Sequence, residues 1–136
     1  MVTMTDRVFF YGTLMSGFDR RCRAGIDPLL VWVGRGRIQA ALFDLGIYPA
    51  AVPDPDGTVW GEVYRTDALE QVLAALDNIE GYRADLPEAS LYLRVEVPVI
   101  YETGETSLAW TYFYNAPLGR AERIRSGDYL EHLGVR

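Results

Sequence analysis

A pair of strands joined by a tight turn places the strongest constraint on the fold of this chain. The first strand, Leu91 to Tyr101, alternates strictly and separates an apolar face from a face that carries Tyr92, Arg94 and Glu96. Thr103-Gly104-Glu105 then reverses the chain into Leu108 to Asn115, which places three aromatic residues on a single face: Trp110, Tyr112 and Tyr114. This pattern predicts an antiparallel hairpin that forms part of a sheet.

One long amphipathic helix is expected from Asp67 to Glu80, opened by Asp67 and Glu70 as a capping box. Its apolar stripe is formed by Leu69, Val72, Leu73 and Leu76. At about 100° per residue, Glu80 lies within roughly 20° of Leu69 around the helix axis, inside that stripe. Gly81 follows as the residue that ends the helix. Burial and the negative end of the helix dipole should both raise the pKa of Glu80, which suits it to proton transfer.

The remaining segments indicate further strands and turns. We expect strands at Arg7 to Tyr11 and Gly36 to Leu45, and a turn at Gly46-Ile47-Tyr48-Pro49. The segment Pro53 to Gly57 is expected to close a hairpin onto a strand from Val59 to Arg65, and Gly119 to Leu133 to hold a short helix. Five or six strands and one long helix predict an α+β fold, a small, mostly antiparallel β-barrel that is closed or nearly closed.

Composition narrows the classes of function. With 49% hydrophobic residues, we expect a single domain over residues 1–136. A net charge of −6 without a basic run argues against nucleic-acid binding. Cys22 and His132 are the only residues of their types, so an intramolecular disulfide is excluded, and neither a zinc site nor a histidine-based triad is expected. The sequence shows no signal peptide and no membrane-spanning run, so we expect a cytoplasmic protein without membrane contacts.

The segment Tyr11-Gly12-Thr13-Leu14 leaves a buried strand through a glycine. A glycine at this position allows successive backbone N–H groups to face a bound anion or a developing oxyanion. A plain turn would give the same four residues, so the segment by itself leaves both interpretations open.

Six segments occur in an order that is typical of one family. They are Val8-Phe9-Phe10-Tyr11-Gly12-Thr13-Leu14, Leu45-Gly46-Ile47-Tyr48-Pro49, Val59-Trp60-Gly61-Glu62-Val63-Tyr64, Leu76-Asp77-Asn78-Ile79-Glu80-Gly81-Tyr82, Tyr92-Leu93-Arg94 and Ile124-Arg125-Ser126-Gly127-Asp128. Together they make the chain resemble the γ-glutamylcyclotransferase-like family, in the branch that contains γ-glutamylamine cyclotransferases and the plant avirulence-induced proteins. The resemblance covers nearly the whole chain.

The resemblance implies a small mixed β-barrel with helices packed outside, and a reaction that needs no cofactor and no metal. In this reaction the α-amine of a γ-glutamyl group attacks its own side-chain carbonyl, which releases an amine and 5-oxoproline. By matching positions, Glu80 is expected to be the general base and acid, and Tyr11 to Leu14 to bind the substrate. Tyr48 is either part of the pocket wall or a structural residue of its turn, and Tyr114 is either a substrate contact or part of the core.

Several alternatives stay open at this level. The same fold could hold a small polar ligand without turnover, or Glu80 could activate water and hydrolyse the γ-glutamyl bond to glutamate. Arg94 could bind substrate, but we favour an ion pair with Asp77 or Glu96. The segment Ser16 to Asp27 matches nothing that we can assign, so the leaving amine is not defined. The oligomeric state is not defined either.

Overall fold

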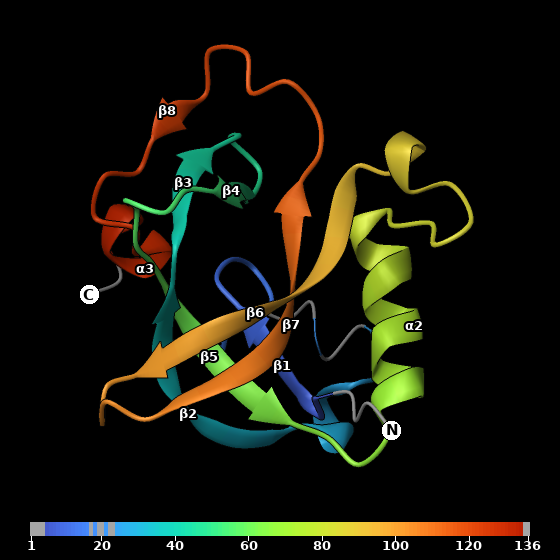
Figure 1. Ribbon diagram of the computed structural model, residues 1–136. Coiled ribbons are helices and arrows are strands. Elements are labelled where there is room, and N and C mark those ends of the chain that lie inside the picture. Colours follow the sequence, from blue (N-terminus) through green and yellow to red (C-terminus); the bar gives the residue numbers. More distant parts are fainter. Residues whose placement is uncertain (1–4, 17, 19–20, 22–23, 135–136) are drawn as a thin grey trace.

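The computed structural model describes residues 5–16, 18, 21 and 24–134, and its centre is a closed five-stranded barrel (Figure 1). Around the barrel the strands follow in the order β1 (Arg7–Phe10), β5 (Val59–Arg65), β2 (Val31–Ile38), β6 (Tyr92–Tyr101) and β7 (Thr106–Tyr114). Neighbouring strands are antiparallel except β1 and β7, whose parallel contact at Val8 and Trp110 closes the barrel. The expected α+β barrel is therefore confirmed.

The expected hairpin of β6 and β7 is present. Tyr92 pairs with Tyr114 at one end, and the turn at Thr103 to Glu105 contains Gly104 with φ of 91° at the other. The end of this face that carries Tyr92 and Arg94 does not lie in water, however. Arg94 forms an ion pair with Asp77 of helix α2 (Leu69–Glu80), and Tyr92 is only 3% exposed.

A second sheet of three strands has the order β4 (Pro49–Pro53), β3 (Ala40–Asp44) and β8 (Glu122–Arg123). Two of our expectations are wrong here. The strand expected from Gly36 to Leu45 is divided at Gln39 between β2 and β3, which belong to different sheets. The turn from Pro53 to Gly57 exists, but it leads from β4 into the barrel, and β4 pairs with β3 instead of β5.

Helix α2 (Leu69–Glu80) buries Val72, Leu73 and Leu76 as expected. Each such side chain stabilises the fold by roughly 1.5–3 kcal/mol. The helix ends at Gly81, whose φ of 68° is left-handed. The expected capping box is wrong, because Ala68 occupies the N-cap position and has no side-chain acceptor. The Thr66 hydroxyl accepts from the Ala68 N–H instead, and Asp67 forms an ion pair with Arg65.

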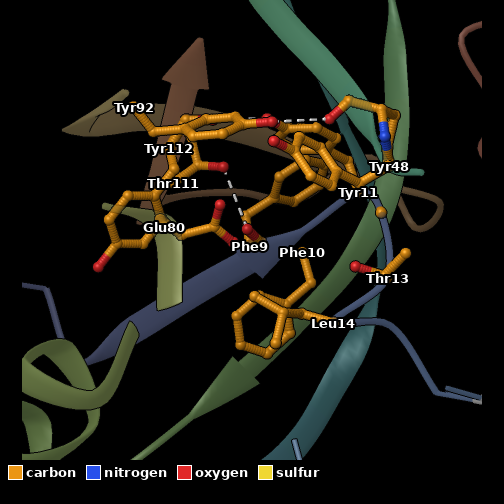
Figure 2. A pocket seen from close by; sticks show the side chains of 12 residues that line it. Phe9, Phe10, Tyr11, Thr13, Leu14, Tyr48, Glu80, Tyr92, Thr111 and Tyr112 are labelled. Atoms are coloured by element: carbon orange, nitrogen blue, oxygen red, sulfur yellow. Dashed lines mark hydrogen bonds between the residues drawn. The ribbon is translucent and has the colours of Figure 1, made fainter. Parts of the chain in front are cut away.

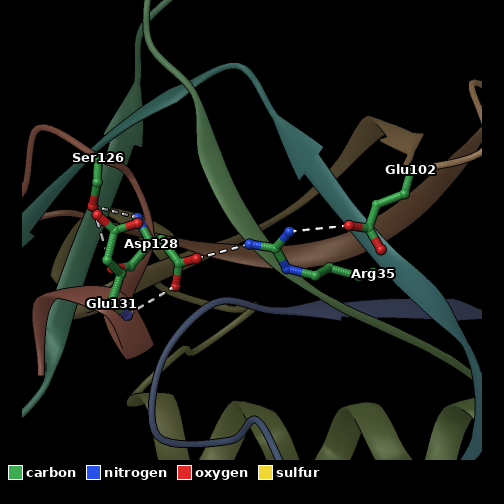
Figure 3. A network of polar contacts seen from close by, with 5 residues as sticks. All are labelled: Arg35, Glu102, Ser126, Asp128 and Glu131. Atoms are coloured by element: carbon green, nitrogen blue, oxygen red, sulfur yellow. Dashed lines mark hydrogen bonds and ion pairs between the residues drawn. The ribbon is translucent and has the colours of Figure 1, made fainter. Parts of the chain in front are cut away.

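The last described segment carries the short helix α3 (Tyr129–His132), which we expected within Gly119 to Leu133. The Asp128 carboxylate caps this helix by accepting from the Glu131 N–H, and its second oxygen lies 2.7 Å from Arg35 Nη2 (Figure 3). Arg35 also reaches Glu102, so one guanidinium on β2 connects the barrel to the helix. At the other end of α3, His132 Nε2 lies 2.8 Å from an oxygen of Asp44 on β3.

The barrel, α2 and the small sheet share one hydrophobic core. Its most deeply buried side chains include Phe9 and Val63 from the barrel, Leu76 from α2 and Leu42 from β3. Within the described residues, no helix has both the length and the apolar composition needed to cross a membrane.

Candidate active site

A pocket of about 370 Å³, its open mouth included, lies where the end of β1 meets the end of α2 (Figure 2). Glu80, the last residue of α2, is half-buried and lines this pocket, and its carboxylate turns toward the end of β1. The helix face that buries Leu76 continues to Glu80, as the sequence pattern predicts. The carboxylate is therefore brought to a pocket wall by the same periodicity that builds the core.

The segment Tyr11 to Leu14 forms the opposite wall of the pocket. It turns sharply, because the Met15 N–H donates to the Gly12 carbonyl over 3.0 Å. Leu14 and Met15 are almost fully buried and attach the turn to the hydrophobic core. Glycine is required at position 12, where a Cβ atom would lie 2.7 Å from Cγ of Pro49. The structure thus brings Glu80 and the whole segment together at one pocket.

Tyr11 is fixed by hydrogen bonds to two other strands. Its hydroxyl donates to the Tyr112 carbonyl over 2.6 Å and accepts from the Ala51 N–H over 3.3 Å. Burial, and after it the charge of Glu80, raises the pKa of Tyr11 well above its ordinary value. Tyr11 therefore remains a neutral phenol that ties β1 to β7 and β4 at the edge of the pocket.

Two further tyrosines line the pocket, and sequence reasoning did not place them there. Tyr92 donates to the Pro49 carbonyl over 3.1 Å (Figure 2). Tyr112 donates to the Asp77 carboxylate over 2.6 Å. Burial is the main cause that raises the pKa of both phenols, and the charge of Glu80 adds to it. The hairpin that carries both residues was expected, but not its position at the end of α2.

The expected ion pair of Arg94 is confirmed. Arg94 Nη1 lies 2.8 Å from Oδ2 of Asp77, and the guanidinium stands between the rings of Tyr82 and Trp110, 5.2 and 5.5 Å from their centroids. Asp77 precedes Glu80 by three residues and so lies one turn earlier on the same helix. Arg94 and Tyr112 thus anchor the last turn of α2 to β6 and β7.

The other two predicted site residues differ in their positions. Tyr48 lines the pocket next to Pro49, and its ring centroid lies 6.2 Å from that of Tyr92. Tyr114 is not among the residues that line the pocket. Its ring packs edge-on against Tyr92 at 5.2 Å and so contacts a residue of the wall.

The pocket offers one carboxyl group among phenols and backbone. Of the described residues in its wall, Glu80 alone carries a carboxyl, ammonium, guanidinium or imidazole group. The hydroxyl of Thr111, also in the wall, donates to the Phe9 carbonyl over 3.1 Å. Across the described parts of the chain, no three His, Cys, Asp or Glu side chains are grouped in a way that could hold a metal ion. Such an arrangement can transfer a proton beside a turn of backbone N–H groups.

Comparison with known proteins gives a consistent result. The pattern of the family described as gamma-glutamyl cyclotransferase, AIG2-like, matches residues 8–131. A protein of Methanocaldococcus jannaschii with a provisional gamma-glutamylcyclotransferase name is 31% identical over 95% of this chain and 99% of its own. The gamma-L-glutamyl-butirosin B gamma-glutamyl cyclotransferase of Niallia circulans is 32% identical over 91% of this chain and 70% of its own.

A solved structure extends the likeness to the fold. The crystal structure of YkqA from Bacillus subtilis superimposes with a TM-score of 0.69 at 25% identity, over 97% of this chain. The chain spans only 42% of the length of YkqA. Three observations point to the same family: the order of the sequence segments, the barrel with helix α2, and a family match that covers most of the sequence. The chain belongs to the AIG2-like gamma-glutamyl cyclotransferase family.

Proposed function

We propose that this protein is a γ-glutamyl cyclotransferase that converts a γ-glutamyl amine or γ-glutamyl amino acid into 5-oxoproline and a free amine. The observation that carries the proposal is the position of Glu80, the one carboxyl group in the described wall of a pocket whose opposite wall is the Tyr11–Leu14 turn. Family membership supports the reaction class. The name of the Niallia circulans relative, which specifies a γ-L-glutamyl group on butirosin B, supports a γ-glutamylated substrate.

Glu80 is assigned the role of general base and then general acid. It takes a proton from the α-ammonium group of the substrate, and the resulting amine attacks the γ-carbonyl carbon to close a five-membered ring. The C–N bond to the leaving amine then breaks. The ammonium loses two protons in all, and both end on the leaving amine, which departs as an ammonium ion. Water is neither consumed nor released.

The reaction has two further requirements. The negative charge of the substrate carboxylate or of the oxyanion must be bound, and the substrate must be held with its amine against its γ-carbonyl. The described wall contributes no Lys or Arg side chain, so we assign the substrate carboxylate or the tetrahedral oxyanion to the backbone N–H groups of the Tyr11–Leu14 turn. The ring closure is intramolecular, and holding the amine against the carbonyl supplies much of the rate. The buried phenols of Tyr92 and Tyr112 border this space and limit its size.

The leaving amine is assigned to the mouth of the pocket, at Tyr48. An amine at the mouth is only partly enclosed, so the chemistry allows an ε-lysine adduct, an amino acid or a γ-glutamylated secondary metabolite. Tyr114 is not assigned a direct contact, because it packs behind Tyr92. Its expected effect on substrate is through the position of that ring.

The test is release of 5-oxoproline from a panel of γ-glutamyl amines and γ-glutamyl amino acids by wild type, Glu80→Gln and Glu70→Gln. Glu70 is an exposed residue of the same helix and serves as the matched control. We expect Glu80→Gln to lose about 10²- to 10⁴-fold in kcat while it stays folded, and Glu70→Gln to match wild type. Release of glutamate in place of 5-oxoproline, no product from the panel, or full activity of Glu80→Gln would contradict the proposal.

A further inference from the structure

A buried carboxylate lies next to the Tyr11–Leu14 turn and outside the pocket wall. Glu62, on β5, is 8% exposed and pairs across the sheet with Phe10, the last residue of β1. It lies in the segment Val59 to Tyr64, to which the proposed mechanism gives no role. We propose that Glu62 is a positioning residue that fixes the Tyr11–Leu14 turn by binding Ser16.

The contacts of Glu62 are directed at the end of this turn. Its Oε1 accepts from the Ser16 N–H and its Oε2 from the Ser16 hydroxyl, each over 2.7 Å. The Tyr64 hydroxyl donates a third hydrogen bond of 3.0 Å to Oε1. A buried carboxylate is costly unless it is hydrogen-bonded, and two of these three bonds come from one residue just after the turn. Displacement of Ser16 would therefore leave the buried Glu62 carboxylate without two of its hydrogen-bond donors.

The turn is held at both ends. Before it, the hydroxyl of Tyr11 is bound to the backbone of β7 and β4; after it, Ser16 is bound to β5 through Glu62. Between these anchors, Leu14 and Met15 are buried and the Met15 N–H closes the turn onto Gly12.

The neighbourhood of Glu62 is built from the segment that the sequence left unassigned. The guanidinium of Arg21 lies over the Tyr64 ring, 4.4 Å from its centroid, and Arg21 forms an ion pair with Asp27. The Arg21 side chain is only 11% exposed. A cation thus covers the phenol that donates to Glu62. Arg21, Tyr64 and Glu62 all lie outside the pocket wall.

This inference rests on the proposed function, because the turn matters for the reaction only if its N–H groups bind the substrate carboxylate or the oxyanion. Displacement of such donors by a fraction of an ångström weakens binding or lowers the rate, and about 1 Å can cost 10²-fold. Glu62 touches neither substrate nor reacting atoms. Its effect must pass through Ser16 and the turn.

The experiment compares Glu62→Gln, Ser16→Ala and Ser16→Thr, with Asp128→Asn as the matched control. Asp128 is another buried carboxylate, 4% exposed, that caps α3 and does not line the pocket. At a temperature where every variant is folded, we expect kcat/KM to fall about tenfold or more in Glu62→Gln and Ser16→Ala. Ser16→Thr retains both donors and should restore activity, and Asp128→Asn should stay within about twofold of wild type.

A double-variant cycle and a binding probe complete the test. If the two residues act as one unit, Glu62→Gln with Ser16→Ala should lose little more than Glu62→Gln alone. The affinity for 5-oxoproline, measured by NMR titration of the turn amides, should weaken about tenfold in Glu62→Gln even without turnover.

The inference is overturned if Glu62→Gln and Ser16→Ala keep wild-type kcat/KM and 5-oxoproline affinity, or if Asp128→Asn loses as much. Loss of turnover in Glu80→Gln alone, with Glu62→Gln fully active, would leave the proposed function standing and remove only the role of Glu62. Weakened 5-oxoproline binding in Glu62→Gln, without turnover by wild type, would retain the role of Glu62 in fixing the turn and remove the proposed reaction.

Discussion

The hydroxyl of Tyr112 donates a hydrogen bond of 2.6 Å to the Asp77 carboxylate, and this bond ties β7 to the last turn of α2 just before Glu80. Arg94 binds the other oxygen of the same carboxylate over 2.8 Å. Asp77 thus holds the helix end against the hairpin from two sides. The orientation of Glu80 depends on this attachment, because the two residues share one helical turn.

Replacement of Tyr112 with Phe should loosen the end of α2. A hydrogen bond to a charged group contributes roughly 1.5–3 kcal/mol, so we expect a loss of about 2 kcal/mol in the free energy of unfolding in urea. We also expect a fall in kcat for 5-oxoproline release. Tyr114→Phe is the control, since Tyr114 lies two residues away on β7 and does not line the pocket. Equal effects of the two variants would contradict the special role of Tyr112.

Replacement of Gly12 with Ala should damage the pocket by contact with Pro49. The added Cβ would lie 2.7 Å from Cγ of Pro49, so one of the two walls must move. Overpacking of this kind costs about 1–3 kcal/mol, and we expect KM to rise as well. At Gly34 the nearest atom to an added Cβ is 3.4 Å away, on Tyr101. Gly34→Ala should therefore be milder in both thermal unfolding and kinetics, and a reversed order would refute the account.

The end of α2 was predictable because its signals are local. The apolar spacing from Leu69 to Leu76 and the glycine at position 81 fix where the helix stops and which face Glu80 joins. The start of the helix was not predicted correctly. Asp67 and Glu70 satisfy the capping pattern, but the chain enters the helix at Ala68, with the Thr66 hydroxyl bound to the backbone.

Strand pairing was less predictable, because it depends on partners far apart in sequence. The turn from Pro53 to Gly57 resembles a hairpin turn, yet β5 pairs with β1 and β2 while β4 pairs with β3. The same limit applies to the pocket. Tyr11 and Tyr48 could be assigned to the pocket from their segments. Tyr92 also belongs to one of the six segments, but neither it nor Tyr112 was expected in the wall, which both reach because the closed barrel presents them to α2.

Three phenols of the pocket should resist ionisation. Burial raises the pKa of Tyr11, Tyr92 and Tyr112, so the folded state favours the neutral form of each. Their contribution to stability is complete below the ordinary pKa of about 10 and declines as the pH rises above it. In an alkaline titration followed by tyrosinate absorbance, these residues should ionise only as the protein unfolds. Smooth ionisation of all nine tyrosines in the folded protein would contradict their burial.

The contact between His132 and Asp44 should contribute to acid stability. The hydrogen bond from His132 is the main cause that lowers the pKa of Asp44 from its ordinary 3.8, with the Gly46 N–H as a second donor. A lowered carboxyl pKa stabilises the fold above the ordinary pKa, and this stabilisation is lost as the pH falls through the lowered value. We expect His132→Ala to raise the Asp44 pKa measured by NMR. The difference in unfolding free energy between wild type and variant should shrink in acid, and a difference that grows there would be inconsistent.

In the proposed reaction the γ-glutamyl group closes on its own amine, and no water enters the product. The decisive experiment runs the best substrate of the panel in ¹⁸O-labelled water and measures the mass of the glutamyl product. The account predicts 5-oxoproline without label, formed in equal amount to the free amine. Glutamate that carries one ¹⁸O atom would show that water attacks the carbonyl, and would contradict it.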